Sequence, residues 1–181
     1  IFTSLIASIS IFGWEEVKDY LFGNSTKELL QKEDWVVSSY GAFPIKISSP
    51  DVLTRNDSKL GQSFSFQSLE DPFNLIINTR LFNKEDDIQS ILIEKLKTEG
   101  ALNILAQQEE FTLDNGLVTT RYYGSFDYIN NEKTSIKKEY SSLSFFENGG
   151  TQTLNIITDR DNKYAKQIRT KIESSIDFNK K

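Results

Sequence analysis

Residues 104–158 include, in order, ILAQQEEFTL (104–113), DNG (114–116), LVTTRYYGSFDY (117–128), NNEK (130–133), IKKEYSSLSFF (136–146), NGG (148–150) and TQTLNIIT (151–158). Ile, Val, Thr, Tyr and Phe favour strands, and a short Asn- or Gly-containing run between two such segments is typical of a β-hairpin. The stretch therefore predicts four consecutive antiparallel strands in a meander.

The chain that precedes the meander also has a period of two, from Trp35 onward. Apolar and polar residues alternate at 43–47, 64–66 and 73–82, so these segments are predicted strands. Residues 51–61 are polar and are predicted to form a loop.

Two amphipathic helices are predicted beside these strands. Glu85–Glu99 has apolar residues at helical spacing, acids early and lysines late, and Gly100 follows it. Asp159–Ser174 has the same spacing, with Asp159 as the expected N-cap. The fold class is therefore predicted as α+β, an antiparallel meander sheet flanked by helices.

An N-terminal helical extension over residues 1–34 is predicted to precede a single α+β domain over residues 35–181. The extension holds a helix from Ile1 to Phe22 and a short second helix, which starts at Ser25 with Glu28 as its capping-box partner. We expect four side chains of the first helix to contact a partner, namely Ile6, Ile9, Trp14 and Tyr20. The helix could instead pack on its own domain, or be the remnant of a membrane anchor or signal peptide, since its apolar part is shorter than the roughly 20 residues of a membrane span.

The composition excludes several kinds of catalytic site. The chain has no cysteine and no histidine, so it lacks the parts of zinc sites, of Ser-His-Asp triads and of thiol nucleophiles. Its net charge of -5 is unlike the basic field of nucleic-acid binders. Residues 159–162 begin like a calcium loop, but Tyr164 stands where that loop needs glycine. No catalytic, metal-binding or cofactor-binding residue is therefore assigned, and no cofactor or nucleic-acid partner is expected.

Charged and aromatic side chains also have structural explanations. Carboxylate pairs such as Glu109-Glu110 are expected on the surface, and the acids at 85–87 are expected to cap a helix. Along 117–128, Tyr122, Phe126 and Tyr128 should share one face of a strand while Tyr123 faces the other.

Four features of residues 39–178 resemble the PsbP-like α/β/α sandwich superfamily. They are SYGAF (39–43) leading into IKISSP (45–50), the single helix after a strand at 85–99, the DNG hairpin at 114–116, and a closing helix that ends in IESSIDF (172–178). This superfamily includes the photosystem PsbP proteins, a Ran-binding import factor, and bacterial DcrB-type lipoproteins and secretion chaperones. The resemblance implies a binding or chaperone-like module.

Taken with the missing catalytic residues, the expected function is a non-catalytic binding, assembly or chaperone-like module that acts through protein–protein contacts. Its partner would be another protein or a second copy, held through the N-terminal helix. The alternatives are a carboxylate-based hydrolase, which needs two acids facing one cleft, and the soluble domain of a membrane-anchored protein. The compartment is not assigned.

Overall fold

The computed structural model describes residues 25–31, 34–43, 45–58, 61–67, 74–83, 86–129, 133–147, 150–162 and 164–178. The helices described are α3 (Ser25–Gln31), α4 (Ile88–Thr98) and α5 (Ala165–Ser174). The strands described are β1 (Trp35–Tyr40), β2 (Ile45–Pro50), β3 (Thr54–Ser58), β4 (Gly61–Gln67), β5 (Asn74–Asn83), β6 (Leu102–Thr112), β7 (Val118–Ile129), β8 (Ser135–Glu147) and β9 (Gly150–Asp159). The predicted helix over residues 1–22, with Ile6, Ile9, Trp14 and Tyr20, lies outside the described residues.

The main sheet has seven strands in the order β3-β4-β5-β9-β8-β7-β6, and β1 and β2 form a separate two-stranded ribbon. Each neighbouring pair is antiparallel, so the predicted meander of β6 to β9 is confirmed. The last strand, β9, lies between β8 and β5, with Asn155 opposite Ser142 on one side and Asn78 on the other.

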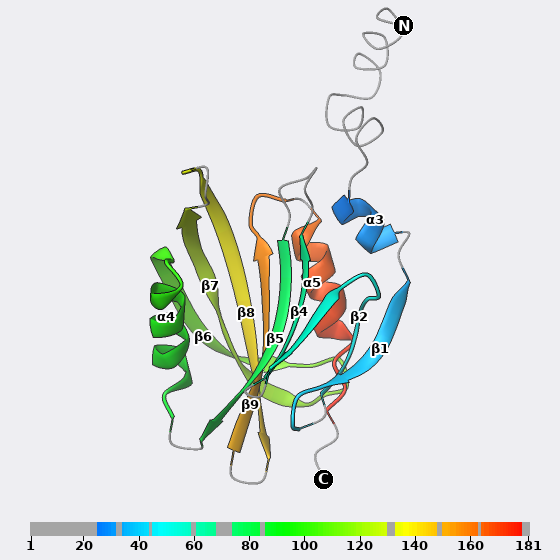
Figure 1. The fold of residues 1–181 in the computed structure, drawn as a ribbon. Coiled ribbons are helices and arrows are strands. Elements are labelled where there is room, and N and C mark those ends of the chain that lie inside the picture. The colour runs from blue at the N-terminus through cyan, green and yellow to red at the C-terminus, as the bar shows by residue number, and fades with distance from the viewer. Residues whose placement is uncertain are drawn as a thin grey trace, which may run out of the picture.

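The two faces of the sheet carry different layers (Figure 1). On one face, here called the α5 face, α5, α3 and the β1–β2 ribbon pack over β9 and its neighbours. On the opposite face, the α4 face, α4 packs beside β6. Because side chains alternate along a strand, Leu154 and Ile156 of β9 point to the α5 face and Ile157 points to the α4 face.

The main hydrophobic core lies under α5. It joins Ile168 and Ile172 of α5 to the sheet and to the ribbon, and all of its members are buried. The fully buried large side chains are Leu29, Ile45, Ile47, Leu75, Ile77, Leu143, Phe145, Leu154, Ile156, Ile168 and Ile172. The cluster under α4 is smaller and holds Leu96, Ala101, Phe126 and Tyr140. Most of the hydrophobic stabilisation therefore comes from the α5 face.

Helix α3 is part of this core, although it belongs to the predicted N-terminal extension. Its Leu29 is buried within the main cluster, and the Trp35 indole Nε1 donates a hydrogen bond to the Leu29 carbonyl at 2.8 Å. The Asn162 amide Nδ2 also donates to Thr26 Oγ1 at 3.0 Å. The boundary near residue 34 stays a prediction, and α3 packs with the body that follows it.

The loop predicted over residues 51–61 is wrong in part, because Thr54–Ser58 form strand β3. This strand pairs with β4, with Arg55 opposite Phe64, and stands at the edge of the sheet. A polar edge strand gives a weak periodic signal, since it needs few apolar side chains and hydrogen-bonds to one neighbour only.

The predicted N-cap at Asp159 is also wrong. Asp159 is the last residue of β9 and is buried, and its carboxylate binds the ammonium group of Lys138 on β8. Helix α5 begins at Ala165, and its cap residue Tyr164 makes no capping bond with its side chain. A buried lysine requires a counter-charge, and this tertiary requirement outweighs the local capping preference.

The other predicted turns and caps agree better with the structure. Asp87 is the N-cap of α4, which starts at Ile88, and its carboxylate accepts hydrogen bonds from Ser90 N at 3.1 Å and Ser90 Oγ at 2.7 Å. These bonds lower the pKa of Asp87. The hairpin between β6 and β7 closes at Gly116, which has a positive φ of 81°.

Candidate functional site

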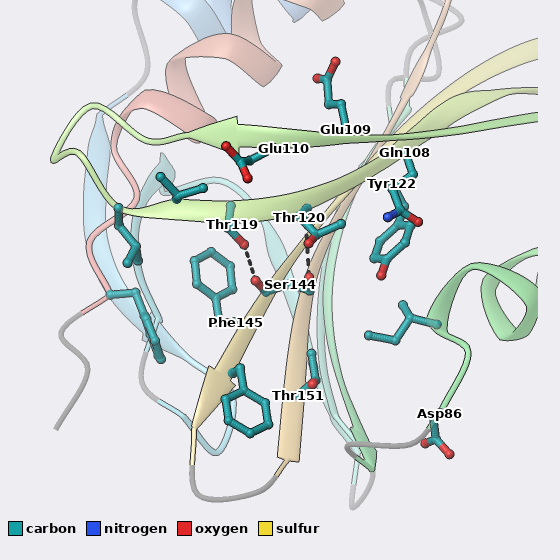
Figure 2. Close-up of a pocket in the computed structure, with 15 residues that line it drawn as sticks. Asp86, Gln108, Glu109, Glu110, Thr119, Thr120, Tyr122, Ser144, Phe145 and Thr151 are labelled. Carbon is teal, nitrogen blue, oxygen red and sulfur yellow. Dashed lines mark hydrogen bonds between the residues drawn. The ribbon is translucent and has the colours of Figure 1, made fainter.

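A broad open concavity of about 770 Å³ lies beside strands β6, β7 and β8 at the end of the sheet. Figure 2 shows it between these strands and the start of α4. Its lining residues are Asp86, Ile88, Gln108, Glu109, Glu110, Leu117, Val118, Thr119, Thr120, Tyr122, Ser144, Phe145, Phe146, Thr151 and Phe178. We call this feature the β6–β8 concavity.

Strand register brings the polar lining together. Gln108 lies opposite Tyr122, Glu110 opposite Thr120, and Thr120 opposite Ser144. Directly opposite residues share a face of the sheet, so these five side chains line one continuous surface on the α4 face. Each of these residues belongs to a regular strand, and the strand backbone fixes the direction in which its side chain points.

Hydroxyl groups are packed closely at the floor of the concavity. Thr119 Oγ1 donates to the Ser144 carbonyl, and Ser144 Oγ donates to the Thr120 carbonyl at 3.2 Å (Figure 2). The Tyr122 phenol is half-buried, and burial, followed by the Asp87 carboxylate, raises its pKa. Tyr122 therefore stays a neutral hydrogen-bonding group at neutral pH.

Among the described residues, the charged side chains of the lining are all acidic, namely Asp86, Glu109 and Glu110. Glu109 and Glu110 point to opposite sides of β6 (Figure 2). Glu110 is exposed, and no ion-pair partner for it is found among the described residues. Asp86 Oδ2 accepts a bond from Asn83 N at 2.7 Å. The α4 side of the concavity is therefore negatively charged.

Two large apolar side chains of the lining are exposed. Val118 is 53% exposed and Phe146 is 44% exposed, and both belong to the α4 face. Exposed apolar side chains beside polar groups are typical of surfaces that bind another molecule.

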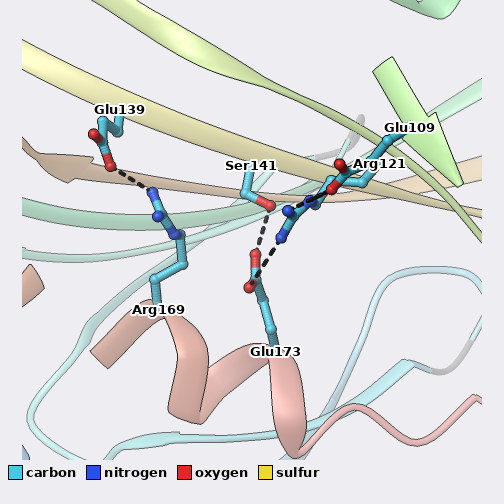
Figure 3. Close-up of polar contacts among 6 residues, drawn as sticks. All are labelled: Glu109, Arg121, Glu139, Ser141, Arg169 and Glu173. Atoms are coloured by element: carbon cyan, nitrogen blue, oxygen red, sulfur yellow. Dashed lines mark hydrogen bonds and ion pairs between the residues drawn. The ribbon is translucent and has the colours of Figure 1, made fainter. Parts of the chain in front are cut away.

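The opposite face carries a network of ion pairs instead (Figure 3). Arg121 Nε donates to Glu109 Oε1 at 2.7 Å, and Arg121 also lies 3.6 Å from Glu173 Oε2 on α5. Glu173 Oε1 accepts from Ser141 Oγ at 2.6 Å. Arg169 of α5 donates to Glu139 at 2.8 Å, as a second bridge between helix and sheet. These ion pairs attach α5 to the sheet, so each of these charges already has a counter-charge within the chain.

The predicted site residues fall in different places. Ile6, Ile9, Trp14 and Tyr20 lie outside the described residues, so the predicted contact surface of the first helix stays a prediction. Tyr122, Phe126 and Tyr128 share one face of β7 and Tyr123 the other, as expected from the strand period. Of these, only Tyr122 lines the concavity.

The sequence pattern alone does not predict the concavity as a whole. Its polar members recur at every second position of adjacent strands, for example Thr120 and Tyr122, or Gln108 and Glu110. That spacing indicates a polar face, but only the strand register shows which segments lie next to each other.

The described residues provide neither a metal site nor a membrane-spanning helix. In the ranges that the structure describes, no three or more acidic, histidine or cysteine side chains gather as a metal site would require. None of the helices in those ranges has the length and apolar character needed to cross a membrane.

Comparison with solved structures establishes the fold. The solution structure of cyanobacterial PsbP (CyanoP) from Synechocystis sp. PCC 6803 matches with a TM-score of 0.53 and 12% identity, over 81% of this chain and 94% of that one. LpqN, involved in cell envelope biogenesis of Mycobacterium tuberculosis, matches with a TM-score of 0.49 and 11% identity, over 81% of this chain and 91% of that one. No family model and no curated protein matches the sequence. The chain therefore has a PsbP-like α+β fold, as the resemblance implied.

Proposed function

We propose that this chain is a non-catalytic binding or assembly module that holds a protein partner in the β6–β8 concavity. The observation that carries the proposal is the combination of exposed apolar side chains, Val118 and Phe146, with the exposed Glu110 carboxylate and several hydroxyl groups on one open surface. A surface that is open, partly apolar and rich in hydrogen-bonding groups suits a polypeptide better than a small enclosed ligand.

The positions of the acids support binding over carboxylate-based hydrolysis. A hydrolase of that kind needs two carboxyl groups that face one reacting bond. Glu109 and Glu110 point to opposite sides of their strand, and Glu109 is held by Arg121 (Figure 2, Figure 3). The acidic side chains of the concavity are thus better placed to attract a basic partner than to act together on one substrate bond.

The N-terminal helical extension is a second proposed contact of the same module. We propose that Ile6, Ile9, Trp14 and Tyr20 bind a protein partner or a second copy, because their helical spacing puts apolar side chains on one surface. Sedimentation of the full chain and of its Ile9→Asp/Trp14→Ser variant tests self-association. An unchanged oligomeric state with unchanged partners would count against this contact.

The main experiment compares the partners of the full chain with those of its Phe146→Asp variant. Proteins retained by the immobilised chain are identified by mass spectrometry, purified and bound again in solution. The matched control is Val37→Asp, since Val37 is 70% exposed on β1. We expect Phe146→Asp to lose a partner that Val37→Asp keeps. Equal retention of every partner by both variants would overturn the proposal.

A further inference from the structure

Strand β6 is a free edge of the main sheet. It stands at the end of the strand order and pairs with β7 only, within the part of the sheet that the structure describes. An edge strand presents half of its backbone N–H and C=O groups to solvent, where another strand can pair with them. At 11 residues β6 is long for an edge strand.

Protection against strand pairing is confined to the start of β6. A bulge lies between Leu102 and Leu105, and Asn103 has a positive φ of 51°. From Leu105 to Thr112 the register with β7 is regular, and the sequence LAQQEEFT contains no Lys and no Pro. The opposite edge, β3, spans only 5 residues. Of the two edges, β6 is the better template for an added strand.

The charge of β6 indicates which kind of strand would pair with it. Glu109 and Glu110 lie in the regular part, and the strand has no cation. Glu109 is already paired with Arg121, whereas Glu110 has no ion-pair partner among the described residues, so two copies paired through β6 would add like charges at Glu110 in a chain whose net charge is already -5. A basic strand would instead place opposite charges across the new ladder.

The β6–β8 concavity continues the surface beside that edge. Gln108 and Glu110 of β6 line it, and Thr112 of β6 lies opposite the exposed Val118 of β7. Side chains of an added strand would alternate between the two faces of the sheet. Every second one would therefore enter the concavity next to Gln108, Glu110 or Thr112.

We propose, building on the binding function above, that the partner segment binds as an extended basic strand added antiparallel to β6. One Lys or Arg residue of that segment lies opposite the exposed Glu110 on the α4 face, and the next lies opposite Glu109, whose carboxylate Arg121 already binds on the α5 face. A large apolar residue opposite Thr112 lies toward Val118. Main-chain hydrogen bonds to Leu105–Thr112 supply the affinity, and the paired charges set the register.

The probe for this mode is the peptide acetyl-TLVKKTT-amide, which places Leu opposite Thr112 and Lys opposite Glu110 and Glu109. Binding of the fluorescein-labelled peptide to the full chain is measured by anisotropy. Two comparison peptides carry either Glu in place of both Lys, or N-methyl groups on the backbone amides that would donate to β6. We expect each change to weaken binding about tenfold or more, since it removes cross-strand charge pairs or backbone bonds.

The variant Glu110→Lys should weaken binding of the Lys-containing peptide about tenfold, whereas Glu94→Lys, on the exposed face of α4, should leave it unchanged. If the N-methylated peptide binds as tightly as the unmodified peptide, the contact depends on charge and not on backbone hydrogen bonds, and strand addition is overturned. The self-association of the chain and of Glu110→Lys is compared as well. If the substitution removes or strengthens self-association, β6 pairs with a second copy of the chain, and the proposal of a basic partner strand is overturned.

The two proposals fail separately. If the peptide does not bind while Phe146→Asp still loses an identified protein partner, strand addition at β6 is wrong and the binding function stands. If the peptide binds but no partner is lost in Phe146→Asp, the concavity is not where the partner is held, and the proposed function is wrong as stated.

Discussion

The side chain of Gln152 occupies the space where a Cβ on residue 41 would lie. A Cβ built on Gly41 would be 2.1 Å from Gln152 Nε2. Gln152 is fully buried, accepts a bond from Phe43 N at 2.8 Å and donates to the carbonyls of Tyr40 and Phe43 at 3.2 and 2.9 Å. The turn between β1 and β2 is thus held to β9 by one amide.

We expect Gly41→Ala to lower the free energy of unfolding by about 2–4 kcal/mol, because the methyl group clashes with Gln152 and the positive φ of 82° is strained for alanine. The matched control is Gly116→Ala, whose φ is 81° but whose Cβ would meet nothing within 4 Å. It should lose about 1–2 kcal/mol only. Urea unfolding measures both, and equal losses would contradict the role of Gln152.

The buried pair of Lys138 and Asp159 gives a second prediction. Both side chains are almost fully buried, so Lys138→Met should cost about 3–5 kcal/mol by leaving the Asp159 carboxylate without its counter-charge. Adding Asp159→Asn to this variant should recover part of the loss. The exposed pair of Lys97 and Glu94 is the control, and Lys97→Met should cost no more than about 0.5 kcal/mol. A double variant less stable than Lys138→Met would contradict the account.

The phenol of Tyr122 should report the charge of Asp87. Burial and then the Asp87 carboxylate raise its pKa above the ordinary 10.0, whereas burial alone raises the pKa of Tyr140. In Asp87→Asn, which keeps a good N-cap, the pKa of Tyr122 should fall but stay above 10.0, and that of Tyr140 should not change. Titration of the tyrosine Cζ signals by NMR measures both, and an equal shift at the two would indicate a general structural change.

These two phenols also predict how stability responds to alkali. Their pKa values are higher in the folded than in the unfolded chain, so their contribution is fully present below about pH 10 and is lost as the pH rises through the folded values. Asp87 has the opposite sign. Its pKa is lowered from 3.8, so its contribution is present above that pH and is lost as the pH falls through the lower value. The midpoint of thermal unfolding, measured from pH 3 to pH 11, should fall at both ends.

Gly124 on β7 should be required for the bulge at the start of β6. A Cβ on Gly124 would lie 1.9 Å from the Leu105 carbonyl oxygen, so Gly124→Ala must displace the backbone next to the bulge. We expect a loss of about 1–3 kcal/mol and faster amide exchange at Leu102–Leu105. Ser125→Ala, at the next position of the strand, is the control, and unchanged exchange in Gly124→Ala would contradict the contact.

The sequence predicts those elements whose signal is local. The DNG turn at 114–116 and the cap at Asp87 follow from residues a few positions apart, and both are present. Asp159 shows the limit, because its local pattern favours a helix cap whereas its partner Lys138 is 21 positions away. The β6–β8 concavity is non-local in the same way, since its residues come from strands β6 to β9, from the start of α4 and from the segment after α5. The predicted first helix, with Trp14 and Tyr20, lies outside the described residues, so it stays a prediction.

The central place of β9 has a consequence for how the chain is assembled during synthesis. Strands β3 to β5 form one half of the sheet and β6 to β8 the other, and β9 alone joins the two halves. Until residues 150–159 have left the ribosome, β5 and β8 each have an unpaired edge. These strands carry apolar side chains, such as Ile77 and Leu143, that are buried only in the folded chain. Pairing at these edges is an aggregation hazard for the nascent chain. Pairing of β9 with both β5 and β8 is therefore the step that closes the described sheet.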